Sequence, residues 1–250
     1  MLPGPDQVVA CPHCGHLALC RTWLSGNSFG ARYWTDGKVE APMLPREPEI
    51  TRCRGCGKFF WVSEARFVEE MDPWSGRGAR PEWKSVNYIQ KLTESEYYEA
   101  IEAGMASDRE REFHLRVLAW WATNDRFRYR ADPGNQVNGA EETEPDSMVV
   151  ANLRRLYDLL DPSAPDARLY PHPLSWWAWE DDLDDLLDPS APEARLMKAE
   201  VARELGDFEL ARKWLDYQFP ANLREVAELI RRLVEKRERR VWEIGVEVPA

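Results

Sequence analysis

The chain has 250 residues, of which 44% are hydrophobic and 31% charged, and its formal net charge is −11 at pH 7. A chain of this length and hydrophobicity buries about 70–75% of its unfolded surface, which excludes a wholly disordered protein. No apolar run reaches the roughly 18 residues of a membrane-spanning helix, so we expect no membrane partner. Residues 1–6 lack the features of a secretion signal, and we expect a cytoplasmic protein whose five cysteines are not paired as disulfides.

Short segments rich in aromatic and β-branched residues occupy the amino-terminal part of the chain. Residues 31–39 place Asp36 and Gly37 between two strand-like runs, a pattern typical of a tight β-hairpin. Residues 59–62 (Phe-Phe-Trp-Val) are predicted to form another strand. The turn-forming residues that follow position 70 end this pattern. We therefore predict an amino-terminal domain over residues 1–70 and a linker over 71–90.

Beyond the linker the hydrophobic pattern has a helical period, which predicts an all-α domain over residues 91–250. Thr93 and Glu96 have the spacing of a capping box, beginning a helix that ends at Gly104. Ser107 and Glu110 repeat that spacing before a helix that ends near residue 130.

Two further helices carry clear apolar stripes at helical spacing. A helix over 147–160 and another over 222–240 are predicted. The stripe residues, expected to face the core, are Val150, Leu153, Tyr157 and Leu160 in the first, and Leu223, Val226, Ile230 and Leu233 in the second. Residues 131–146, rich in Gly, Asn, Glu and Pro, are predicted as a loop.

An eleven-residue sequence occurs twice in the helical part. Residues 159–169 and 186–196 are identical at ten of eleven positions. Each copy has a Leu-Leu-Asp helix end, a proline and a serine cap, but Pro171 and Pro173 follow the first copy and prevent a long helix there. We interpret residues 161–187 as a tandem duplication inserted into the helical domain.

Four cysteines form two Cys-x-x-Cys pairs, residues 11 and 14 and residues 53 and 56, each followed by a glycine. The glycine lets the backbone turn back with positive φ while amides approach the sulfurs. Four thiolates suit Zn²⁺ in a closed tetrahedral shell, which leaves no position for catalysis. We therefore predict one zinc ion per chain, with the ligands Cys11, Cys14, Cys53 and Cys56.

Residues 8–63, with both cysteine pairs and the strand after the second pair, resemble the rubredoxin-like zinc ribbon family. The resemblance implies a small three-stranded sheet, with the metal held between two loops by the same four cysteines. Rubredoxins bind iron at these positions, so an iron-binding redox protein is an alternative. Near the first pair, we expect His13 to face solvent, His16 to be no ligand because four cysteines complete the shell, and Cys20 to be a small buried residue.

Residues 194–215 resemble a tetratricopeptide unit. The matching features are Gly206-Asp207 at the turn, Phe208 at the start of the second helix, and the small Ala199 and Ala211 where the helices must touch. Neighbouring helices would have to cover the apolar face of a lone unit. The concave face of that family binds peptides, so the resemblance implies a protein or peptide partner. The order of ribbon, linker and helical array also resembles a group of bacterial proteins that combine these parts.

Charge is distributed unevenly, which bears on possible partners. Residues 1–62 carry a net charge of +2 and residues 141–188 a net charge of −10, so only the amino-terminal part could bind nucleic acid. The candidate residues for that alternative are Arg21, Arg32, Lys38, Arg52, Arg54 and Lys58, with Tyr33 and Trp34 as a stacking surface. The basic run 231–240 could dock an acidic partner, but we expect it to complement a helix carboxyl terminus.

The common catalytic motifs are absent from the sequence, and its four histidines (His13, His16, His114 and His172) are scattered. We therefore expect a non-catalytic α+β protein, in which a small β zinc ribbon precedes an all-α, tetratricopeptide-like domain. Its expected function is that of an adaptor whose helical surface binds a protein or peptide. The alternatives are a nucleic-acid-binding zinc ribbon regulator and an iron-binding, rubredoxin-like redox protein.

Overall fold

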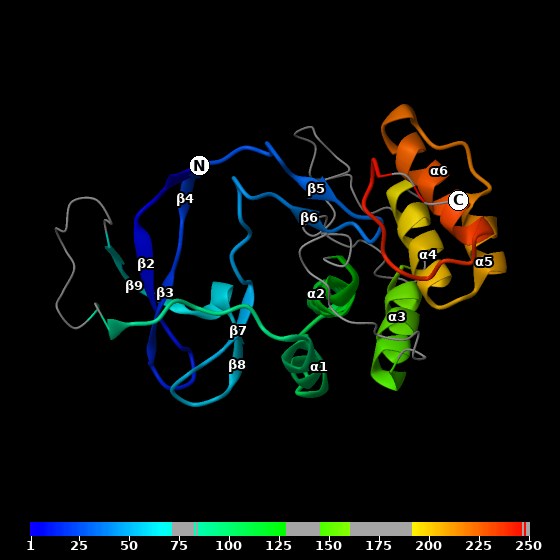
Figure 1. Cartoon of the computed structure of the whole chain (residues 1–250). Helices are drawn as coiled ribbons and strands as arrows, with labels where there is room; N and C mark the ends of the chain where they lie inside the picture. The colour runs from blue at the N-terminus through cyan, green and yellow to red at the C-terminus, as the bar shows by residue number, and fades with distance from the viewer. Residues whose placement is uncertain (72–82, 84, 129–145, 161–191, 247, 249–250) are drawn as a thin grey trace. The chain divides into compact units, whose positions relative to one another are not determined.

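A computed structural model describes residues 1–71, 83, 85–128, 146–160, 192–246 and 248 (Figure 1). Within these residues, small antiparallel strands come first in the chain and six α-helices follow, which confirms the α+β class. The chain forms two compact units: unit 1 comprises residues 1–31 and 40–96, and unit 2 comprises residues 32–39 and 97–250. Among the helices described here, none has the length and apolar character needed to cross a membrane.

A three-stranded antiparallel sheet organises unit 1. Its central strand β2 (Asp6–Ala10) lies between β3 (Leu17–Cys20) and β9 (Arg66–Met71), and Val8 is paired with Leu19 on one side. Val8 and Leu19 are buried against Trp83. A separate two-stranded sheet joins β1 (Leu2–Pro3) to β4 (Trp23–Ser25). Strand β9 was not predicted, because its charged residues alternate irregularly with apolar ones.

A β-hairpin carries the second cysteine pair. Strand β7 (Ile50–Arg52) pairs antiparallel with β8 (Phe59–Trp61), and a short 3-10 helix (Val62–Glu64) follows. All three residues of β8 are buried, so both faces of this strand are covered. The strand predicted over 59–62 therefore exists and ends one residue earlier.

A second hairpin, predicted around Asp36 and Gly37, is also present. Strands β5 (Arg32–Tyr33) and β6 (Val39–Glu40) pair with each other, and Gly37 has a φ of +82° at the turn. Residues 32–39 of this hairpin belong to unit 2, although they lie between the two cysteine pairs in sequence. Local sequence predicted the turn but not the unit to which it belongs.

The first two helices test the predicted capping boxes. Before α1 (Glu94–Glu102), the Thr93 amide donates to Glu96 Oε2 (2.9 Å) and the Glu96 amide donates to Thr93 Oγ1 (3.3 Å), which confirms that box. The cap of α2 (Arg109–Arg128) is Asp108, whose Oδ1 accepts from the Arg111 amide (2.8 Å). The prediction of Ser107 as this cap is wrong, because its hydroxyl instead donates to the Asp108 carboxylate.

Helix α3 (Ser147–Leu159) closely matches the range predicted for it, but its buried face is rotated about the helix axis relative to the predicted stripe. Val149 and Leu156 are buried, whereas the predicted Val150 and Tyr157 are half-buried. Tyr157 stays at the edge of the core, where its hydroxyl accepts a hydrogen bond from Trp214 Nε1 (2.7 Å). The predictions of a loop over 131–146 and of a duplication over 161–187 lie outside the described residues, except that Asp146 caps α3.

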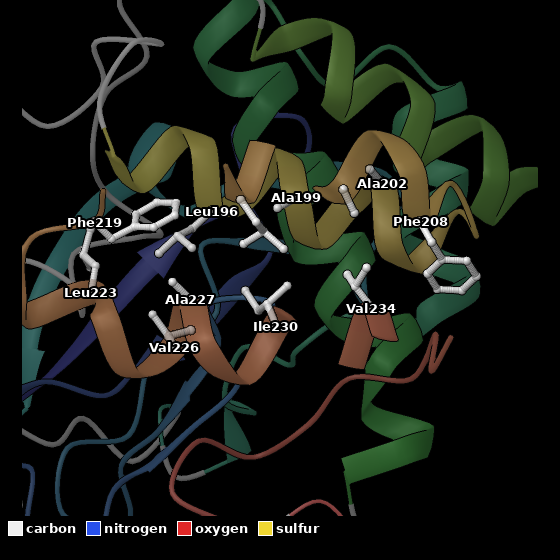
Figure 2. Close-up of a cluster of buried hydrophobic side chains, with 12 residues drawn as sticks. Leu196, Ala199, Ala202, Phe208, Phe219, Leu223, Val226, Ala227, Ile230 and Val234 are labelled. Carbon is white, nitrogen blue, oxygen red and sulfur yellow. The ribbon is translucent and has the colours of Figure 1, made fainter. Parts of the chain in front are cut away.

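Helices α4 (Pro192–Glu204), α5 (Phe208–Leu215) and α6 (Ala221–Glu235) share one apolar core (Figure 2). Gly206 has a φ of +85° after α4, and Asp207 caps α5 by accepting from the Leu210 amide (3.0 Å). The predicted helical hairpin is therefore present. Its small residues Ala199 and Ala211 are fully buried, as close contact between helices requires.

Basic residues at the end of the chain complement the carboxyl ends of other helices. Helix α6 ends at Glu235 rather than near residue 240, because Arg237 adopts a left-handed conformation with a φ of 54°. Beyond it, Arg239 Nε donates to the Glu204 carbonyl at the end of α4 (2.9 Å). Arg231, within α6, donates to the Leu215 carbonyl at the end of α5 (2.8 Å).

Candidate metal centre

Two turns of the same construction carry the four paired cysteines. One joins β2 to β3, and the other joins β7 to β8. In each, the glycine amide donates to the carbonyl of the first cysteine, from Gly15 to Cys11 (2.9 Å) and from Gly57 to Cys53 (2.8 Å). Both glycines have positive φ, +74° and +73°, as the spacing predicted. Each turn therefore directs the thiols of its two cysteines toward one common point.

The four sulfur atoms converge on one point. All Sγ atoms of Cys11, Cys14, Cys53 and Cys56 lie within 4.8 Å of one another. The Cys14 and Cys53 sulfurs are 3.6 Å apart, and those of Cys11 and Cys56 are 3.9 Å apart. A tetrahedral metal with four bonds of about 2.3 Å would place its sulfurs about 3.8 Å apart. The arrangement therefore has the dimensions of a four-thiolate metal site, and no disulfide joins these residues.

Backbone amides approach the first sulfur of each pair. The His13 amide donates to Cys11 Sγ (3.4 Å), and the Gly55 amide donates to Cys53 Sγ (3.3 Å). Such bonds stabilise negative charge on sulfur. Cys11 and Cys53 are buried, whereas Cys14 and Cys56 are exposed, so one side of the site is accessible to solvent.

The thiols influence the ionisation of one another. Burial opposes ionisation of Cys53, but amide bonds from Cys56 and Gly55 and the neighbouring thiols outweigh it and lower its pKa to about 7. The amide of His16 lowers the pKa of Cys14, yet partial desolvation by the surrounding atoms and the other three thiols together raise it to about 12. Without a cation, one thiolate therefore forms at the expense of its neighbours. A divalent metal removes this conflict, because it binds all four as thiolates.

The two histidines near the first cysteine pair, His13 and His16, contact the β7–β8 hairpin and are outside the sulfur cluster. His13 is exposed, as predicted, and its Nε2 is 3.0 Å from the Phe59 carbonyl in β8. His16 packs against Gly55, where an added Cβ would lie 2.8 Å from the His16 Cβ. Gly55 is thus required by a close approach between the two turns. The sequence gives no signal for either contact, because each joins residues far apart in the chain.

Cys20 lies in β3, away from the cluster, and is a small buried residue as predicted. It packs against Val9 and Ile89. Burial, followed by the charges of Glu47 and Asp6, raises the pKa of Cys20 to about 11. Its thiol therefore stays protonated and unreactive near neutral pH.

The residues predicted to form a nucleic-acid surface are not brought together within one unit. Arg32, Tyr33, Trp34 and Lys38 belong to unit 2, whereas the other four cations belong to unit 1. Trp34 is only 3% exposed, so the prediction that it stacks on a base is wrong. Arg32 forms an ion pair with Glu243 (2.6 Å), and Lys38 forms one with Asp125.

Comparisons of the chain with protein-family models, curated proteins and solved structures gave no match. The chemistry of the site is therefore inferred from its own residues.

Proposed function

We propose that the protein is a non-catalytic, zinc-binding adaptor. In this proposal Zn²⁺ stabilises unit 1, and the helices of unit 2 present a surface to a protein or peptide partner. The convergence of four cysteine sulfurs carries the proposal. Four thiolates complete the tetrahedral shell of Zn²⁺, so the metal supplies folding free energy and has no open position for a substrate.

Support for a partner surface comes from the helical hairpins of unit 2 and from the resemblance of residues 194–215 to a peptide-binding family. A groove of about 530 Å³ lies between α5, the segment after it and α6. Its volume is within the range of sites that hold small ligands. The groove is lined by charged, polar and apolar residues: Arg212, Leu215, Asp216, Tyr217, Gln218, Arg231, Val234 and Glu235.

The metal part of the proposal is tested by native mass spectrometry of the untagged protein. We expect one zinc per chain, lost when any one of the four paired cysteines is replaced by serine. One iron per chain would instead favour electron transfer, the alternative use of a four-thiolate site. A folded unit 1 with no metal would contradict the proposal.

The partner part is tested with a photo-crosslinking residue at Gln218, which lines the groove and is exposed. The matched control carries the same residue at the exposed Glu225 of α6, which does not line the groove. We expect a specific protein to be crosslinked from position 218 and not from 225. Equal yields at both positions would argue against this groove as the binding surface.

A further inference from the structure

Two of the four paired cysteines are open to solvent. Cys14 and Cys56 are exposed, whereas Cys11 and Cys53 are buried. Cys14 lies in a run of five exposed residues, 12–16, and Cys56 lies in a second run of five, 54–58. A small reagent in solution can therefore reach one sulfur in each turn of unit 1.

Each exposed sulfur lies beside a buried sulfur of the other turn. Cys14 Sγ is 3.6 Å from Cys53 Sγ, and Cys56 Sγ is 3.9 Å from Cys11 Sγ. A disulfide bond is about 2 Å long, so a modest approach of the two sulfurs in each pair would allow a bond to form. Both pairs cross from one turn to the other, and neither is a Cys-x-x-Cys pair of the sequence.

A cysteine that is sensitive to oxidation has an ionised sulfur, access to solvent and a neighbouring cysteine that can react with its oxidised form. Cys14 and Cys56 have the access and the neighbour by their position. They have the ionised sulfur when Zn²⁺ is bound, because a metal-bound thiol is deprotonated. Cys20 is buried and outside the sulfur cluster, so it has neither the access nor the neighbour.

We propose that Cys14 and Cys56 are sites of oxidation by a hydroperoxide, and that each then forms a disulfide with the buried cysteine beside it in the other turn. Unit 1 would thus release its zinc in response to peroxide. The inference rests on the metal part of the function proposed above and adds a reaction to it. The peroxide reacts with sulfur, so the closed shell of the metal is no obstacle.

The chemistry has two steps at each exposed sulfur. The Cys14 thiolate attacks one peroxide oxygen, the O–O bond breaks, and the sulfur becomes a sulfenic acid while hydroxide leaves. The Cys53 thiolate then attacks the Cys14 sulfur, so that an S–S bond forms, the S–O bond breaks and a second hydroxide leaves. Both hydroxides take up a proton to become water, so each disulfide consumes one peroxide and two thiolates. The same steps join Cys56 to Cys11.

Oxidation changes the metal content of unit 1 but keeps its two turns joined. The two disulfides use all four ligands, so Zn²⁺ cannot stay bound. Each disulfide joins the turn between β2 and β3 to the turn between β7 and β8, which are the two turns that the metal joins. A thiol reductant cleaves disulfides, so reduction in the presence of Zn²⁺ should restore the site.

Mass spectrometry of the full-length, zinc-loaded protein treated with hydrogen peroxide tests the proposal. We expect loss of one zinc per chain and a mass lower by four hydrogens than that of the metal-free, reduced chain. Peptide mapping should find disulfides that join Cys14 to Cys53 and Cys11 to Cys56. Dimedone, which traps sulfenic acids, should label Cys14 or Cys56 and not Cys20. Dithiothreitol with added Zn²⁺ should return the original mass.

A variant removes the exposed sulfurs and keeps a tetrahedral shell. Cys14→His combined with Cys56→His leaves two cysteines and two histidines, a set that also binds Zn²⁺. Peroxide should release zinc from this variant more slowly by about tenfold or more, as measured with a coloured zinc indicator. The control Cys20→Ala removes a buried thiol outside the cluster and should release zinc as fast as the unsubstituted chain.

Three results would overturn the inference. One is zinc that stays bound under conditions that oxidise glutathione. Another is disulfides formed within the Cys-x-x-Cys pairs, and the third is sulfenic acid trapped first at Cys20. The mass measured before peroxide is added separates this failure from a failure of the proposed function. A chain that carries no zinc at that point contradicts both, whereas zinc that is bound and resists peroxide contradicts the inference alone.

Discussion

Arg128 and Asp36 form an ion pair in which both side chains are fully buried. Arg128 Nη1 donates to Asp36 Oδ1 (3.0 Å) and Nη2 donates to Oδ2, so the pair is bidentate. Trp121 Nε1 donates to the Asp36 carbonyl (2.9 Å), and Asn124 Nδ2 donates to its carboxylate (3.0 Å). Asp36, which lies between the two cysteine pairs in sequence, is therefore part of the interior of unit 2. Its hydrogen bonds hold the last turns of α2 in place.

Removing one partner of this pair should strongly destabilise unit 2. Burial opposes the charge of Arg128, but the charges of Asp36 and Asp125 outweigh burial and raise its pKa. Arg128→Met leaves Asp36 buried without its cation, and we expect a loss of about 3–5 kcal/mol in the free energy of unfolding. Urea denaturation, monitored by the circular-dichroism signal of the helices, measures this loss in the free energy of unfolding.

The control Arg240→Met removes a partly exposed ion pair with Glu238 and should cost less than about 1 kcal/mol. Combining Asp36→Leu with Arg128→Met should recover part of the loss, because no buried charge is then left alone. Similar losses for Arg128→Met and Arg240→Met would show that the buried pair has no special role.

Glu204 at the end of α4 carries a buried carboxyl next to this ion pair. Its carboxyl accepts from Trp120 Nε1 (2.7 Å) and from Asn124 Nδ2 (3.0 Å), and Asn124 also bonds Asp36. Burial and then the charge of Glu200 raise the pKa of Glu204 to about 8, against the opposing effect of Arg203. Glu204 therefore keeps its proton to a higher pH in the folded chain than in the unfolded chain.

The raised pKa of Glu204 predicts that unit 2 loses stability as pH rises. Between about pH 4.5 and 8 the folded chain binds a proton at Glu204 that the unfolded chain has released, so the free energy of unfolding falls with pH. The stabilisation from the Glu204 proton is fully present below about pH 4.5. Between about pH 4.5 and 8 the free energy of unfolding falls by about 1.4 kcal/mol per pH unit.

Urea denaturation at several pH values checks this expectation. Glu204→Gln should flatten the decline, because the glutamine has no proton to release. The control Glu228→Gln, at an exposed position of α6, should decline as steeply as the unsubstituted chain. An unchanged slope in Glu204→Gln would show that another group causes the decline.

Features predicted correctly from the sequence are those set by residues close together in the chain. The Thr93–Glu96 capping box and the turn at Gly206-Asp207 follow from spacings of one to three residues. The convergence of the cysteines was also expected, since each pair is arranged by its own turn. The second capping box failed because Asp108 competes with Ser107 for the same helix end.

Features set by distant residues were missed. Asp36 and Arg128 are 92 residues apart, and the sequence around Asp36 resembles any Asp-Gly hairpin turn. The contact of His16 with Gly55 and the bond between His13 and Phe59 also depend on the fold. Trp34 was a candidate stacking residue under the nucleic-acid alternative, whereas it is buried and packs against Arg128 in unit 2.

Replacing a paired cysteine should separate the stability of unit 1 from that of unit 2. Cys53→Ser removes one of the four converging sulfurs, and we expect loss of bound zinc and of amide protection in β2, β3, β7 and β8. Protection in α4 and α6 should persist, because they pack in a separate core. Hydrogen exchange resolves the two units. The control Cys20→Ala replaces the cysteine outside the cluster and should still bind zinc. Loss of zinc from Cys20→Ala would contradict the assignment of the four ligands.

Gly57 offers a test of how far backbone conformation contributes to metal binding. Its φ is +73° and nothing lies within 4 Å of an added Cβ, so a substitution causes conformational strain without a clash. Alanine in this conformation costs about 1–2 kcal/mol, whereas asparagine tolerates it better. We therefore expect Gly57→Ala to weaken zinc binding about tenfold and Gly57→Asn to weaken it less, as measured by competition with a chelator. Equal losses in the two variants would show that the positive φ is not the reason for glycine at this position.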